Sequence, residues 1–332
     1  MSNKNALVLL ADSHYLEHTK VVFYTAVKFG NWKGDCVLLA YEIDDSVSLE
    51  WFKERDIKIV SVNRETFDFT SIEKEKFVYF AKLYLFHPFW NNYDKLIYLD
   101  TDVIVRKDIN PLLKYKDFAA AHDCFQYTLI HQFSPPGKPY KDAFINNHFP
   151  RKVLRKISFN TGVMVIQSKK NTIEQYRELI NLTNSYGSHS VFYDQGVINL
   201  HFIQKRQRIP YVFNDYYASE FHGKGGFIKR KNDRDAVILH IIHPFKPWNE
   251  NCIYHNEWKS HYQQSLKELR PQAKPIKASL FSIYKVDLIS RLRIVEIYTR
   301  GSLAKTVGYA SWRTGQYFRK ALSVFYKNEN KS

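Results

Sequence analysis

Two carboxylates one residue apart form the sharpest chemical feature of this sequence. The segment KLIYLDTDVIV (95–105) is an apolar run interrupted by Asp100-Thr101-Asp102. Where the chain turns after a strand, both carboxylates can reach one hard cation, and Mg²⁺ and Mn²⁺ take oxygen ligands that they share with phosphate groups. An ordinary turn explains the same residues, because Asp is common after strands. The position directly behind an apolar strand favours the metal site.

A second polar group stands in VILHIIHPFKPW (237–248). His240 ends an apolar run that is typical of a strand, and Lys246 follows six residues later. An imidazole is a suitable ligand for Mn²⁺, and a lysine neutralises a phosphate as a point charge. Taken alone, each residue has a plainer explanation, namely a hydrogen-bonded core histidine and a solvated lysine. Separation along the chain is no obstacle to one shared site, because strand ends from distant segments meet at one edge of a sheet.

Short apolar strands alternate with amphipathic helices in the first part of the chain. The pattern predicts strands over 6–11, 36–41, 57–62 and 95–99, and helices over 17–28, 47–55 and 76–86. Later segments predict strands over 119–121, 160–167, 208–212 and 237–241, and helices near 172–182 and from 194 onward. Such alternation indicates an α/β fold with a parallel sheet covered on both faces and a ligand site beyond the carboxyl ends of its strands.

Residues 124–158 interrupt this regularity with a stretch rich in His, Asn, Phe and Pro that has no clear period. Irregular stretches of this length inside a compact domain are usually functional. We expect this segment to act as a lid over an acceptor substrate. The regular pattern ends near Arg270, which predicts a catalytic domain over 1–270 and a separate basic tail over 271–332.

The tail combines positive charge with apolar faces. Residues 276–332 hold eleven Lys and Arg against three Asp and Glu, so they supply +8 of the net +16. One helical face carries Tyr284, Leu288, Leu292, Val295 and Tyr298, and Phe318, Leu322 and Phe325 repeat the pattern, with Trp312 nearby. This composition favours an interfacial helix on an anionic membrane. The alternative is that these faces pack on the catalytic domain or on a second subunit in a homodimer.

Composition also bounds the compartment and the partners. The three cysteines, Cys36, Cys124 and Cys252, are scattered without metal-binding or redox spacing, which is typical of a reducing compartment. No apolar run approaches the ~18 residues that span a bilayer. We therefore expect a cytoplasmic protein, peripheral on the cytoplasmic face of the membrane. Nucleic acid is not expected as a partner, because no recognisable binding module accompanies the charge.

Five motifs in order resemble the successive signatures of glycosyltransferase family 8, which includes glycogenin and bacterial lipopolysaccharide galactosyl- and glucosyltransferases. They are FAKLYLF, YDKLIYLDTDVIVRKDINPLL, FNTGVMVIQ, YDQGVINLHF and HIIHPFKPW, and the similarity covers roughly residues 5–255. Five co-linear motifs are far more specific than any single one. The resemblance implies a GT-A fold, which is a Rossmann-like, mostly parallel mixed sheet. It also implies a UDP-sugar donor, Mn²⁺ (or Mg²⁺) and retention of anomeric configuration.

The resemblance also implies roles for individual residues. Asp100, Asp102 and His240 match the metal ligands, and Lys246 matches the lysine that binds the departing diphosphate. The remaining matches are residues that contact the donor or line the reaction centre: Ala11, Asp12, Lys82, Thr101, Asn160, Asp194, Gln195 and His243. Each has a structural alternative. Asn160 can simply turn the chain, and Asp194 is a good helix N-cap.

Two positions depart from the family pattern. His243 stands where the family has Gly close to phosphate, which leaves open a narrower pocket, a new hydrogen bond to the diphosphate or a shifted loop. Ser13 and His14 stand where acidic and amide residues are frequent, so the identity of the donor sugar stays open.

The resemblance leaves the acceptor open among glycans, lipid-linked sugars and proteins. The sequence does not assign Asp194 as a nucleophile, and it is expected instead to orient the donor while the acceptor hydroxyl attacks from the leaving-group face. Two alternative functions remain: a glycogenin-like primer that glycosylates one of its own 23 Tyr, and, more distantly, a basic nucleic-acid-binding protein.

Overall fold

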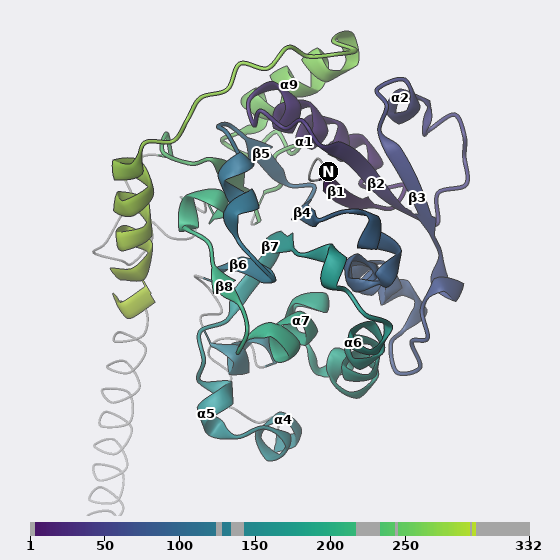
Figure 1. Cartoon of the computed structure of the whole chain (residues 1–332), viewed down its shortest axis with the longest axis vertical. Coiled ribbons are helices and arrows are strands. Elements are labelled where there is room, and N and C mark those ends of the chain that lie inside the picture. Colours follow the sequence, from purple (N-terminus) through teal and green to yellow (C-terminus); the bar gives the residue numbers. More distant parts are fainter. Residues whose placement is uncertain are drawn as a thin grey trace, which may run out of the picture.

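A seven-stranded mixed sheet forms the centre of the computed structural model, which describes residues 4–123, 128–133, 143–216, 233–242, 245–292 and 294–296 (Figure 1). The order is β3-β2-β1-β4-β7-β6-β8. Strands β3, β2, β1 and β4 run parallel, and β7 is antiparallel to both of its neighbours. The bounds are β1 (Asn5–Ala11), β2 (Asp35–Tyr41), β3 (Lys58–Val62), β4 (Lys95–Leu99), β6 (Phe118–His122), β7 (Phe159–Ile166) and β8 (Gln207–Arg208). The predicted mostly parallel mixed sheet is confirmed.

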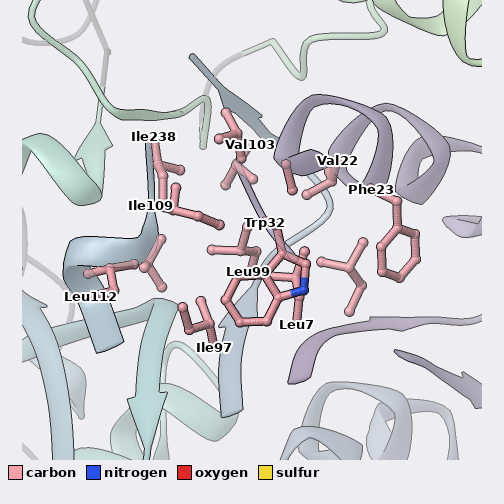
Figure 2. Packing of buried hydrophobic residues seen from close by; sticks show 14 of the residues in the cluster. Leu7, Val22, Phe23, Trp32, Ile97, Leu99, Val103, Ile109, Leu112 and Ile238 are labelled. Carbon is pink, nitrogen blue, oxygen red and sulfur yellow. The ribbon is translucent and has the colours of Figure 1, made fainter. Parts of the chain in front are cut away.

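Each face of the sheet packs against its own hydrophobic core. Alternate residues of β1 point to opposite sides, because side chains alternate along a strand. Leu7 belongs to a cluster with helix α1 (Leu16–Lys28), whereas Val8 belongs to a cluster with α6 (Ile173–Tyr186) and α7 (Asp194–Phe202). Figure 2 shows the first cluster, in which Leu7 lies near Val22 and Phe23 of α1 and Ile97 and Leu99 of β4. Helices therefore cover both faces, as expected.

A second, smaller sheet has the order β5-β10-β9, with β5 (Val103–Val105), β9 (Asp215–Tyr216) and β10 (Ile238–His240). β5 begins directly after the two aspartates, and its antiparallel register with β10 sets His240 opposite Val103. The backbone N–H of Ile241 then donates to the carbonyl of Asp102 at 3.0 Å. This pairing brings His240 next to Asp102, although the two residues are far apart in the sequence.

Three predicted elements are shorter than expected. The helix predicted over 47–55 is reduced to α2 (Glu50–Lys53), and the strand over 208–212 ends at β8 because Pro210 has no N–H to continue a ladder. The helix over 76–86 divides into α3 (Phe77–Phe80) and a 3₁₀ turn, Ala81–Phe86. His87 precedes Pro88, a position that disfavours the α conformation, so the chain leaves the helix there.

The segment 124–158 builds a small core of its own where the structure describes it, over 128–133 and 143–158. A 3₁₀ turn (Leu129–Gln132) and the short helices α4 (Ala143–His148) and α5 (Arg151–Leu154) surround a separate apolar cluster. Regular turns thus replace part of the irregular stretch that the sequence indicates. Its role as an acceptor lid stays a prediction.

Helix α9 (His255–Lys267) closes the domain against α1, with Lys28 paired to Glu268 at 2.5 Å. After it, the chain runs to a C-terminal helix, defined here as residues 280–292 and 294–296 (Figure 1). One side of this helix packs on the sheet core through Val286, and Arg208 donates to Asp287 at 2.9 Å.

Six apolar residues on another side of the C-terminal helix are exposed: Leu280, Phe281, Tyr284, Leu288, Leu292 and Val295. One side of the helix therefore packs on the domain, and attachment of the other side to a membrane stays a prediction. Tyr298, Trp312, Phe318, Leu322 and Phe325 lie outside the described residues. Within the described part of the chain, no helix combines the length and the apolar character that crossing a bilayer requires.

Candidate active site

A cavity of about 260 Å³ lies beyond the carboxyl ends of β1 and β4, where the α/β pattern predicts it. Strand ends and the turn after α3 deliver most of the predicted residues to its wall. The wall includes Ala11, Asp12, Tyr15, Tyr79, Lys82, Tyr98, Asp100, Thr101, Asp102, Asp194 and Lys246. His240 lies directly behind it, whereas His243 is outside the described residues.

Asp100, Asp102 and His240 converge as a set of side chains that could hold a metal ion. One ligand atom from each lies within 4.8 Å of the other two. His240 Nε2 is 3.1 Å from Asp102 Oδ1 and 3.9 Å from Asp100 Oδ2. Both His240 Nε2 and Asp102 Oδ1 are buried without a hydrogen-bond partner. Buried polar atoms are normally satisfied, so two such atoms facing each other fit a divalent cation between them.

The orientation of His240 is fixed by a buried chain of amides. Asn214 Nδ2 donates to Asn160 Oδ1 at 2.9 Å, so the Asn214 oxygen faces His240 Nδ1, at 2.8 Å. Nδ1 must therefore carry the hydrogen, which leaves the lone pair of Nε2 directed at the aspartates. Asn160 Nδ2 in turn donates to Gln195 Oε1 at 2.8 Å.

Gln195 holds the far end of this series of hydrogen-bonded amides. Its Nε2 donates to Asp123 Oδ2 and to Gln132 Oε1, each at 2.9 Å, and its Oε1 also accepts from the N–H of Thr161. With its amide engaged in this way, Gln195 lies behind the cavity wall rather than on it. Asn160 and Gln195 thus hold the metal ligands in place in this structure.

Gly162 leaves room for the metal ligands. A Cβ at this position would lie 2.3 Å from His240 Cε1 and 2.8 Å from Asp100 Oδ2. The carbonyl of Gly162 also accepts from the N–H of Asp100 at 2.8 Å, which ties β7 to the turn after β4. No side chain other than hydrogen fits here without displacing a ligand.

Lys82 bridges two carboxylates at the floor of the cavity. Its Nζ lies 3.1 Å from Asp100 Oδ1 and 3.2 Å from Asp194 Oδ2. Burial by itself lowers the pKa of Lys82, but the two carboxylates outweigh it and hold the pKa above its usual value. Burial raises the pKa of Asp194, an effect that Lys82 and a 3.0 Å hydrogen bond from Thr161 offset only in part.

Lys246 forms the second cation of the cavity and contacts Asp102 Oδ2 directly. Burial alone would raise the pKa of Asp102, but the positive charge of Lys246 beside it holds the pKa well below its usual range. Asp102 is thus a carboxylate at neutral pH. The four carboxylates of the cavity wall (Asp12, Asp100, Asp102, Asp194) outnumber its two lysines (Lys82, Lys246), and this excess of negative charge suits a divalent cation.

The end of β1 forms a third part of the cavity. Asp12 Oδ1 accepts from the N–H of Tyr15 at 3.1 Å, which turns the chain into α1. The Tyr15 ring meets Trp248 edge-on, with 5.8 Å between centroids, and Trp248 stacks on His18 at 3.7 Å. Ala11 and Asp12 thus line the cavity beside this aromatic group, and their contact with a nucleotide base stays a prediction.

Sequence reasoning missed several contributors to the site, among them Tyr15, Tyr79, Tyr98, Gly162 and Asn214. Gly162 lies inside the motif FNTG, and Tyr15 closely follows Asp12, so both carried a local signal. Asn214 lies in no motif that the sequence analysis used, and its proximity to His240 follows from the pairing of β9 with β10.

Comparisons with known proteins agree with this geometry. The model of the family described as glycosyl transferase family 8 matches residues 6–252. Glycogenin-1 of Caenorhabditis elegans is 24% identical over 267 residues, which cover 78% of this chain and 53% of that protein. Lipopolysaccharide 1,2-glucosyltransferase of Escherichia coli is 26% identical over 184 residues, covering 53% and 50%. The chain spans about half the length of these curated relatives.

Solved structures share the fold. A crystal structure of the galactosyltransferase LgtC in complex with donor and acceptor sugar analogs superimposes with a TM-score of 0.56 at 18% identity. The match covers 78% of this chain and 95% of that chain. The architecture is therefore the GT-A fold that the sequence motifs imply.

Proposed function

The chain belongs to glycosyl transferase family 8, and on this premise we propose that it is a retaining hexosyltransferase that uses a UDP-sugar and a divalent cation. The observation that carries the metal is the pair of unpartnered buried atoms, His240 Nε2 and Asp102 Oδ1. Asp100, Asp102 and His240 would hold Mn²⁺ or Mg²⁺, which supplies positive charge to the diphosphate of the donor.

The two lysines of the cavity are proposed to have different electrostatic roles. Negative charge develops on UDP as the bond between sugar and phosphate breaks. Lys246 enters the cavity from the segment after β10 beside the metal ligands, and so it can neutralise the departing diphosphate. Lys82 is already paired with Asp100 and Asp194, so its proposed role is to fix these two carboxylates and to hold the donor sugar beside them.

Asp194 suits an orienting role better than that of a nucleophile. A carboxylate that attacks the sugar must be free to move, whereas Asp194 is buried and is held by Lys82 and Thr161. Retention then follows when the acceptor hydroxyl attacks from the face that the diphosphate leaves.

The acceptor is proposed to be a glycan or a lipid-linked sugar at an anionic membrane surface. The support is the C-terminal helix, whose exposed side carries the six apolar residues named above. A cytoplasmic, peripheral location is part of the same proposal.

Release of UDP from a panel of UDP-hexoses tests the reaction directly. We expect release with one of them in Mn²⁺ or Mg²⁺ and none after EDTA treatment. Intact mass without added acceptor separates hydrolysis from self-glycosylation, because the glycogenin-like alternative adds hexose units to the chain. Failure of every UDP-hexose in both metals would contradict the proposal.

A further inference from the structure

Two tyrosines stack at the mouth of the catalytic cavity. The rings of Tyr79 and Tyr193 are nearly parallel, at 11°, with centroids 4.2 Å apart. Tyr79 lines the cavity and stays 44% exposed, which is unusual for so large a ring beside a buried charge cluster. The pair therefore offers a flat apolar surface at the cavity entrance.

Each tyrosine is fixed to one half of a reaction-centre ion pair. Tyr79 lies one turn before Lys82, and Tyr193 immediately precedes Asp194. Lys82 Nζ lies 3.2 Å from Asp194 Oδ2 inside the cavity, and the two rings stack at the cavity entrance. The two chain segments thus approach each other twice, once through charge and once through the aromatic stack.

The backbone of Tyr193 adopts a strained conformation. Its φ of 49° and ψ of −119° lie in a region that side chains other than glycine rarely adopt. Residues in such conformations cost on the order of 1–3 kcal/mol and cluster at ligand-binding sites. The stack with Tyr79 and an edge contact with Phe80 hold the ring in place.

We propose that the Tyr79–Tyr193 pair is the platform on which the acceptor sugar stacks through its apolar C–H face. This rests on the proposed function, which puts the diphosphate beside Lys246, and on the family resemblance, which implies that Ala11 and Asp12 contact the donor. The aromatic surface next to Asp194 is left for the second substrate. The acceptor class is therefore a pyranoside rather than a peptide side chain alone.

The substitutions Tyr79→Ala and Tyr193→Gly test the platform, with Tyr79→Phe as the conservative variant. Glycine adopts φ of 49° without strain, so Tyr193→Gly removes the ring and keeps the backbone. The exposed Phe89, which does not line the cavity, serves as the matched control in Phe89→Ala. The first readout is the ratio of transfer to donor hydrolysis, with methyl and octyl glucosides and galactosides as acceptors.

We expect Tyr79→Ala and Tyr193→Gly to lower this ratio at least ten-fold through a higher acceptor KM. Tyr79→Phe and Phe89→Ala should stay near the wild type. Saturation-transfer NMR of the same glycosides, with UDP and Mg²⁺, should show contact at ring C–H protons that Tyr79→Ala abolishes.

An unchanged ratio, or a rise in donor KM instead, would overturn the platform and assign the pair to the nucleotide. Absence of glycoside binding to the wild type would overturn it as well. Failure of the proposed function looks different, because the wild type would then release no UDP from any donor.

Discussion

At the residue scale, the metal site depends on charge as well as on oxygen atoms. Asp100→Asn and Asp102→Asn keep a carbonyl oxygen but remove the charge that holds the cation against the diphosphate. We expect either variant to abolish transfer at saturating Mn²⁺, with melting temperatures close to the wild type. Steady-state kinetics together with thermal melts measure both properties. Wild-type turnover in either variant would remove that residue from the ligand set.

Lys246 is expected to act on the transition state rather than on donor binding. Its ammonium group meets negative charge that grows as the diphosphate departs, so Lys246→Ala should lower kcat about 10²-fold or more and change donor KM less. Donor saturation curves give the two parameters separately. If only KM rises, Lys246 merely binds the ground-state phosphate.

The residues with charge were predictable from the sequence, whereas their neutral supports were predictable only in part. Asp100, Asp102 and Lys246 stand in motifs that directly follow strands, where ligand sites form. Asn214 carries no such signal, because a hydrogen bond to a metal-ligating histidine depends on the pairing of β9 with β10. Gln195 was predicted for the site, but its place behind the cavity wall depends on partners as distant as Asp123 and Gln132.

At the element scale, β7 must approach the turn after β4 without a side chain at Gly162. We predict that Gly162→Ala weakens Mn²⁺ binding at least ten-fold and lowers kcat, because its Cβ displaces His240 or Asp100. Calorimetric titration with Mn²⁺ measures the first effect. Gly187→Ala is the matched control, since its closest contact is the flexible end of Ile72, far from the metal ligands. Equal Mn²⁺ affinity in the wild type and Gly162→Ala would contradict the argument.

The strands were predicted more accurately than the short helical turns. Continuous apolar runs such as those of β1 and β2 identify buried parallel strands within a residue or two. The turns are set by local exceptions, including Pro210 and the His87-Pro88 step, whose effect outweighs the apolar spacing. Contact between β5 and β10 could not be predicted, because three-residue strands carry too little pattern to define a register.

The two sides of the C-terminal helix make separable predictions. We expect Leu288→Ser with Leu292→Ser to reduce co-sedimentation with anionic vesicles at low salt, because burial of these side chains supports the attachment. The melting temperature should stay unchanged, since both residues are exposed. Val286→Ala is the converse control: it removes buried contacts and should lower the melting temperature while vesicle binding remains. Full-length protein that ignores anionic vesicles would contradict the membrane proposal.

At the scale of the whole molecule, buried histidines make stability depend on pH. Burial lowers the pKa of His122 to about 3, with Arg208 and Arg206 adding to the effect, and burial lowers the pKa of His18 to about 4. The unfolded chain binds these protons near pH 6.5, whereas the folded chain resists them. The free energy of unfolding should therefore fall as the pH drops from about 6.5 toward 4.

His122→Phe tests this dependence, because it removes one of the protons and keeps a ring against Tyr211. Urea denaturation at several pH values should give a flatter profile for the variant than for the wild type. Parallel profiles would show that His122 does not contribute.

The β5–β10 pairing also sets the order in which the site can be completed during synthesis. His240 follows Asp102 by 138 residues (240 − 102). At about 5–20 residues per second, the ribosome needs roughly 7 to 28 s to supply the third ligand after the second. A nascent chain that has already folded β1 to β4 therefore carries two aspartates without a histidine to complete the set. On the proposed function, the ability to hold the cation, and with it to consume donor, is acquired only when the domain is nearly finished.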